Sequence, residues 1–133
     1  MKLHQSAASY RAVAIRTATP GQLILMLFDG ALRFIGAAEQ GFKEENVVKR
    51  NELVHNNIVR ALNIIRELQN SLNMEAGGEF ASQMYGLYDF MSTQLQTANL
   101  EKKVEPLQLV YRLLGEIRDA WSEMLNKSIA RPQ

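Results

Sequence analysis

The chain has 133 residues, 47% of them hydrophobic and 22% charged, as in one folded globular domain. Its net charge of +1 is too small for a surface that binds nucleic acid. The lack of cysteine excludes disulfides, zinc-thiolate sites and thiol catalysis. The N-terminus lacks the apolar core of a signal peptide, and no stretch approaches the ~20 apolar residues needed to span a bilayer. We therefore expect a soluble intracellular protein with no membrane span.

The first 18 residues are weakly patterned. Their larger apolar side chains are Tyr10, Val13 and Ile15. These three suit one face of a short helix, or an extended arm that packs on the rest of the chain. Because a free tail needs no apolar groups of this size, the segment is expected to make a contact.

A strong helix-start signal follows at Thr19, the expected N-cap. Gln22 completes a capping box, and Pro20 suits the first turn because its missing N–H would be unpaired there. Residues 23–28 are then an unbroken apolar run, more than the single stripe that a surface helix needs. This surplus predicts either neighbours on all sides or an apolar face that is reserved for a partner.

Three more helices are expected: one after the N-cap Asn46, one over 79–98 after the flexible pair Gly77-Gly78, and one from Pro106. Apolar residues at helical spacing give each helix an expected core stripe. The stripes are Leu23, Leu27, Ala31, Phe34 and Ala38, with Ile24, Phe28 and Ile35 beside them; Val47, Val54, Ile58, Ala61, Ile65, Leu68 and Leu72; Phe80, Met84, Leu87, Met91, Leu95 and Ala98; and Leu107, Val110, Leu114, Ile117, Trp121 and Met124.

No segment alternates as a strand does, and long helices joined by short turns pack antiparallel. The pattern predicts an all-α fold, an antiparallel up-down four-helix bundle with a short N-terminal arm or helix. We expect three parts: the arm over 1–18, the bundle over 19–127 and a loose tail over 128–133.

The sequence offers little chemistry. Glu52 and His55 form a Glu-x-x-His, but a di-iron bundle needs two such motifs and the only other histidine is His4. Asp29 is embedded in the apolar first helix; a buried catalytic carboxylate is one interpretation, but we expect it to pair with a neighbouring helix or to face the rim, with Arg33 one turn on within reach. We therefore expect no enzyme, no cofactor and no metal site.

Several motifs in order resemble the flagellar export chaperone family FliS. The likeness extends from Tyr10 to about Met124, with mild departures at Phe28 and Phe90, where tyrosine is usual, and at Asn73, where aspartate is common. The motifs are Tyr10 followed by TATPGQLILMLFDGALRF from Thr17, ALNIIREL from Ala61, GGEF from Gly77, LYDFM from Leu87 and IRDAW from Ile117.

The resemblance implies an antiparallel helical bundle that binds the C-terminal region of flagellin in the cytoplasm. It would prevent premature flagellin polymerisation and aid delivery to the flagellar export apparatus. In the family, the client wraps around the bundle, and the chaperone's own N-terminal segment covers part of the groove until the client displaces it.

Seven residues are expected to contact the partner, chosen for surplus apolar surface; a matched family motif supports this role only for Tyr10. They are Tyr10 and Val13 in the arm, Ile24 and Phe28 on the exposed side of the first helix, and Val59, Leu62 and Ile64 on the facing wall of the second. The alternative is a self-associating helical module without a flagellin client, in which the same surface forms a homodimer. The oligomeric state is expected to be a monomer or a weak homodimer.

Overall fold

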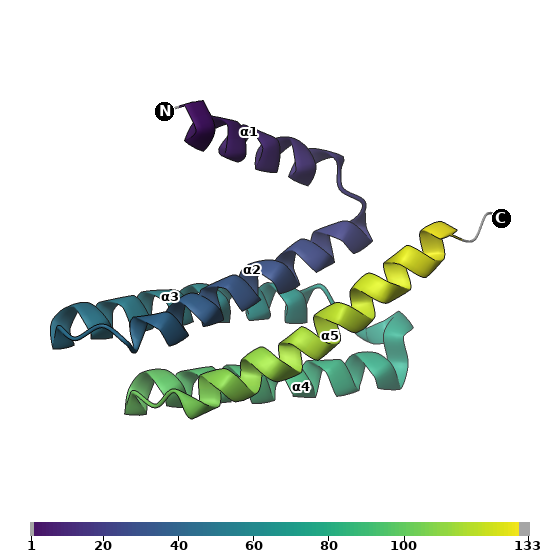
Figure 1. Cartoon of the computed structure of the whole chain (residues 1–133). Helices are drawn as coiled ribbons and strands as arrows, with labels where there is room; N and C mark the ends of the chain where they lie inside the picture. Colours follow the sequence, from purple (N-terminus) through teal and green to yellow (C-terminus); the bar gives the residue numbers. More distant parts are fainter. Residues whose placement is uncertain (1, 131–133) are drawn as a thin grey trace.

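The computed structural model describes the backbone of residues 2–130 and the side chains of residues 8–128. All regular structure in that range is helical (Figure 1). The helices are α1 (Lys2–Thr17), α2 (Pro20–Gly41), α3 (Val47–Asn70), α4 (Met74–Glu101) and α5 (Glu105–Ala130). The predicted all-α class is confirmed.

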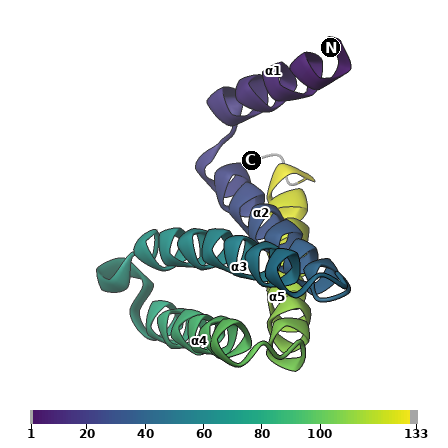
Figure 2. The same cartoon turned by 90° about the vertical axis from the view of Figure 1, so that its left-hand side faces the viewer.

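Four of the five helices share the core. α2 packs against α3 and α5, and α4 packs against the same two helices. α1 forms no interface of comparable extent, and it stands apart from the other helices in both views (Figures 1 and 2). The N-terminal segment is thus a helix, and most of its side chains from residue 8 on are exposed.

Side-chain caps start the helices where the sequence predicts them. The Gln22 N–H donates to Thr19 Oγ1 over 3.2 Å, and the Thr19 N–H donates to Gln22 Oε1 over 3.0 Å, which completes the capping box. Asn46 Oδ1 accepts from the Lys49 N–H over 2.9 Å. Asn73 caps α4 in the same way, with a bond of 3.0 Å to its amide oxygen.

The core is a continuous apolar cluster along the facing sides of α2 to α5. In α2 the buried stripe is rotated from the expected one: Phe28 and Ile35 are in the core, whereas Leu23 is 38% exposed. The fully packed side chains are Phe28, Ala31, Ile35, Ala38, Val54, Ile58, Ala61, Ile65, Leu68, Tyr88, Met91, Leu95, Ala98, Leu107, Val110 and Leu114.

α4 differs most from its predicted form. It begins at Met74, before the Gly77-Gly78 pair, and bends at Gly78, whose φ of 54° and ψ of −131° are not helical. Past this bend, Phe80 is 65% exposed and Tyr88 is only 3% exposed, the reverse of the sequence expectation. Both residues lie after the bend, where the buried stripe passes through Ala81, Tyr88, Met91, Leu95 and Ala98, and Phe80 lies beside this stripe near the bend.

Two glycines let α2 and α3 approach closely. A Cβ placed on Gly30 would lie 3.2 Å from Ile64 Cδ1, and one on Gly41 would lie 3.1 Å from Leu53 Cβ. Both contacts are tighter than ordinary van der Waals distance, so the absence of a side chain is what permits this spacing. Gly41, the last residue of α2, therefore serves as a small packing site.

Two further expectations need correction. α5 continues to Ala130, so the expected boundary at 127 falls inside a helix; residues 131–133 of the expected tail lie outside the described residues. Within the described residues, α2 is long and apolar enough to cross a membrane by length and composition alone. Its buried stripe packs against α3 and α5, and a core helix passes the same test.

Candidate functional site

The N-terminal helix presents large apolar side chains to solvent. Tyr10 is 79% exposed, Ile15 54% and Val13 48%. Exposed apolar groups gathered on one element are typical of a surface that is covered by a partner. The structure therefore leaves Tyr10 and Val13 accessible for contact.

Of the two predicted contact residues in α2, Phe28 is misplaced. It is 2% exposed, and the Trp121 ring meets it edge-on with centroids 6.3 Å apart. The indole N–H of Trp121 donates to the Gly21 carbonyl over 2.9 Å, which holds the Trp121 ring against Phe28. Ile24 is half-buried and packs against the core. The expectation that Phe28 lies on an exposed side is wrong, because α5 covers that side.

The three predicted residues of α3 do not form one wall. Helical geometry of 100° per residue places Leu62 and Ile64 on opposite flanks of the buried stripe. Ile64 faces α2 at Gly30, and both side chains are half-buried against the core. Val59 is 36% exposed. These residues can therefore contribute to two surfaces, one on each side of α3.

Sequence reasoning missed two exposed apolar residues of α2. Leu23 is 38% exposed and Met26 is 36% exposed, and their i,i+3 spacing places them on neighbouring parts of one face. The sequence did contain a sign of this exposure. Arg33 lies seven residues, about two helical turns, after Met26, so a charged residue occupies the same outer face of α2. Leu23 and Met26 are new candidates for partner contact.

Asp29, the acid embedded in α2, pairs with α5. Arg118 Nε donates to Asp29 Oδ1 over 2.7 Å, and Arg118 Nη1 reaches Asp119 Oδ1 at 3.3 Å. The hydrogen bond to Asp29, followed by that to Asp119, raises the pKa of Arg118 above its ordinary value. This confirms the expected pairing with a neighbouring helix, and the carboxylate is engaged in structure.

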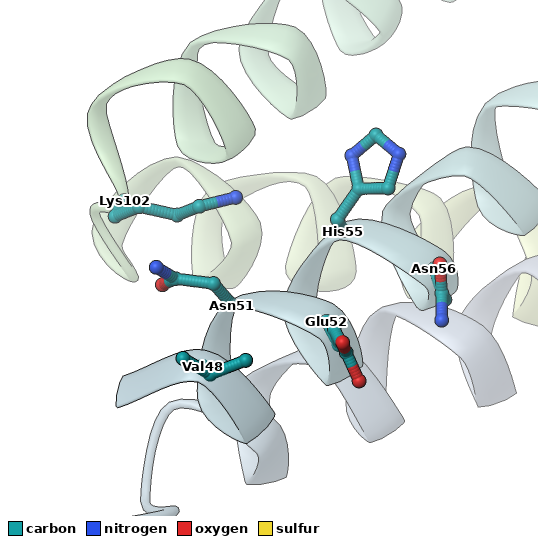
Figure 3. Close-up of a pocket in the computed structure, with 6 residues that line it drawn as sticks. All are labelled: Val48, Asn51, Glu52, His55, Asn56 and Lys102. Carbon is teal, nitrogen blue, oxygen red and sulfur yellow. The ribbon is translucent and has the colours of Figure 1, made fainter. Parts of the chain in front are cut away.

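A shallow hollow of about 400 Å³ lies where α3 meets the end of α4 (Figure 3). Glu52, His55 and Lys102 are among the residues that line it, and the side chains of Glu52 and His55 extend from α3 in different directions, so the Glu-x-x-His pair does not converge. Lys102 Nζ donates to Asn99 Oδ1 over 2.6 Å, and Asn99 Nδ2 lies 2.9 Å from His55 Nδ1. Desolvation lowers the pKa of Lys102. Among the described residues, no three His, Asp or Glu side chains are grouped to hold a metal.

The fold is all-helical, and its N-terminal helix exposes three large apolar side chains, as proteins that bind other polypeptides do. Comparisons with known proteins identify the family to which the chain belongs. The family model described as "Flagellar protein FliS" matches residues 3–128. The chain belongs to this family of flagellar secretion chaperones.

Curated relatives agree with that assignment. The chain is 34% identical over 125 residues to the flagellar secretion chaperone FliS of Bacillus subtilis, covering 94% of this chain and 90% of the relative. It is 36% identical over 116 residues to the FliS of Salmonella typhimurium, covering 86% and 83%. The resemblance drawn from the motifs is confirmed.

Proposed function

We propose that this protein binds the C-terminal region of flagellin in the cytoplasm, prevents its premature polymerisation and aids its delivery to the flagellar export apparatus. Membership of the flagellar secretion chaperone family carries the proposal. The exposed apolar side chains of α1, α2 and α4 support it, since a chaperone must offer surface that its client covers.

In this proposal, α2 to α5 act as an antiparallel up-down four-helix bundle, and α1 as a movable arm. The client would contact Tyr10 and Val13 on α1 and the half-exposed flanks at Ile24, Val59, Leu62 and Ile64. Leu23 and Met26 extend that surface along α2. Phe28 makes no direct contact with the client in this proposal; it is a core residue beneath this surface.

Binding would be coupled to folding of the client. Ordering a disordered segment costs a few kcal/mol, and a large wrapped apolar surface offsets this cost. Such a mechanism suits a small domain whose apolar residues are spread over several helices, because each contact can be weak while the sum is specific.

Isothermal titration calorimetry with the C-terminal segment of flagellin from the same organism tests the proposal. We expect saturable one-to-one binding with a large negative heat-capacity change. A folded, monomeric protein that shows no binding would overturn the proposed client.

The alternative function is self-association through the same surface. It is favoured by the exposure of Tyr10 and Ile15 on a helix that lies apart from the core. Light scattering after size-exclusion chromatography separates the two. A monomer, or a dimer that dissociates at micromolar concentration, supports client binding, and a tight dimer supports the alternative.

A further inference from the structure

Two arginines from neighbouring helices converge on one aromatic ring. The guanidinium carbon of Arg33 on α2 lies 5.2 Å from the centroid of Phe34, and that of Arg60 on α3 lies 5.6 Å from the same centroid. Both distances are within the range of a cation–π interaction. Phe34 itself is half-buried and packs against the core, so a fixed part of the fold orients both charges.

Among the side chains that the structure describes, no Asp or Glu lies within 4.0 Å of the guanidinium of Arg33 or Arg60. Arg118, by contrast, is held by two carboxylates. Two guanidinium groups held at one ring give this surface a positive charge that attracts an anion.

Apolar surface adjoins the two charges. A Cβ on Gly30 would lie 3.2 Å from Ile64 Cδ1 and 3.9 Å from Arg33 Nη2, so the guanidinium of Arg33 lies at the α2–α3 seam beside Ile64. Met26, 36% exposed, lies two turns before Arg33 on the same outer face of α2. The surface therefore combines two oriented arginine side chains with adjoining apolar residues, Met26 and Ile64.

We propose that Arg33 and Arg60 form a carboxylate clamp that takes an Asp or Glu side chain of the bound client, with an apolar residue of the client lying toward Met26 and Ile64. The inference rests on the proposed function and gives that surface a polar anchor. Charge complementarity favours a carboxylate as the occupant: a guanidinium group can donate two parallel hydrogen bonds to it, and the second arginine adds to the positive charge at the same ring. Because Phe34 already orients the guanidinium groups, less side-chain entropy is lost on binding.

The clamp would fix the register of the client. Apolar contacts are non-directional, so a wrapped segment held by them alone could slide along the bundle. A single charge-assisted contact at the α2–α3 seam would favour one position over the others.

The test compares Arg33→Gln/Arg60→Gln with the unaltered protein in calorimetric titrations of the flagellin C-terminal segment at low and high salt. We expect the Kd of the double variant to rise about tenfold at low salt and to lose most of its salt dependence, because a screened charge contact has been removed. The matched control is Arg66→Gln, an exposed arginine on the other flank of α3 without an ion pair among the described side chains. It should change Kd less than about twofold.

Two further reagents locate the contact. Arg33→Lys/Arg60→Lys keeps both charges but not the planar forks, and we expect its Kd between those of the unaltered protein and the Gln double variant. Client peptides in which each Asp or Glu in turn becomes Asn or Gln should include one that reproduces the loss, with no added loss when it is combined with the Gln double variant.

The outcomes are separable. Tight binding by the unaltered protein and an equal Kd and salt dependence in the Gln double variant would overturn the clamp and leave the proposed function standing. No binding of the segment by the unaltered protein would overturn the proposed function and the clamp with it. A loss in the Gln double variant that Arg66→Gln does not share, together with one non-additive carboxylate in the client, establishes the clamp.

Discussion

Arg118 on α5 donates from Nε to Oδ1 of Asp29 on α2 over 2.7 Å and so joins two helices across 89 positions of sequence. The bond lies beside Trp121, whose indole N–H also binds α2, at the Gly21 carbonyl. Two polar contacts thus fix α5 over the start of α2, where Phe28 is buried.

A double-mutant cycle with Asp29→Ala and Arg118→Ala should give a coupling energy of about 0.5–1 kcal/mol in urea unfolding, decreasing with salt. The side chains remain 46% and 32% exposed, so solvent screens their attraction. The control cycle pairs Arg118 with Asp119, which is 77% exposed and 3.3 Å away. A larger coupling to Asp119 than to Asp29 would contradict the prediction.

Phe28→Ala should destabilise the fold by about 3–5 kcal/mol, because it removes a buried ring and leaves a cavity beneath Trp121. Urea unfolding measures the loss. The control, Met26→Ala, lies two residues away on the exposed face and should cost less than about 1 kcal/mol while weakening client binding. Equal losses of stability in both variants would show that Met26 is also a core residue.

The helix starts could be predicted because a cap depends on residues three positions apart: Thr19 and Gln22 carry their own signal. Which side of α2 is buried could not, because residues 23–28 are apolar in every direction and only the partner helices select the phase. The stripe of α4 was misread at Phe80 because the segment after Gly78 carries more apolar and aromatic residues than one stripe needs, and only packing against α3 and α5 buries Tyr88 in place of Phe80.

The candidate site shows the same division. The surplus of apolar surface and the accessible Tyr10 follow from composition and motif. The convergence of Arg33 and Arg60 on Phe34 requires α3 to lie against α2, a contact that no local pattern in either helix encodes.

Two glycine substitutions in α4 should have opposite signs. Gly86→Ala should stabilise the fold by about 0.5–1 kcal/mol, since Gly86 is helical and a Cβ there meets no atom within 4 Å. Gly78→Ala meets equally open space, but its φ of 54° is strained for any L-residue and should cost about 1–3 kcal/mol. Thermal unfolding of the pair measures both. Stabilisation by Gly78→Ala would mean that the kink is absent in solution.

Tyr10→Ala should weaken client binding by about 1–3 kcal/mol and leave the unfolding free energy within about 0.5 kcal/mol. The side chain is 79% exposed on a helix that lies apart from the core, so its removal leaves no cavity. Calorimetry and urea unfolding give the two numbers. Its neighbour Ser9→Ala, also exposed, is the control and should change neither. A large loss of stability with unchanged affinity would place Tyr10 in a packed interface.

Tyr88 makes the stability of the fold sensitive to alkaline pH. Desolvation by burial raises its pKa from the ordinary 10.0 to about 12. The unfolded chain therefore loses the phenolic proton at lower pH than the folded chain does. The contribution of the protonated Tyr88 phenol to the free energy of unfolding is therefore fully present below pH 10, and it is lost as the pH rises from 10 toward about 12.

Two pKa units correspond to a loss of about 2–3 kcal/mol across that window. Urea unfolding at pH values below 10 and near 12 measures the loss, and Tyr88→Phe should remove this share of it. Other groups titrate over the same range, so the comparison is made with Tyr85→Phe, which lies on the same helix and is 41% exposed. That control should keep the full pH dependence. If Tyr88→Phe retains it as well, then the phenol of Tyr88 reaches water and its burial does not oppose ionisation.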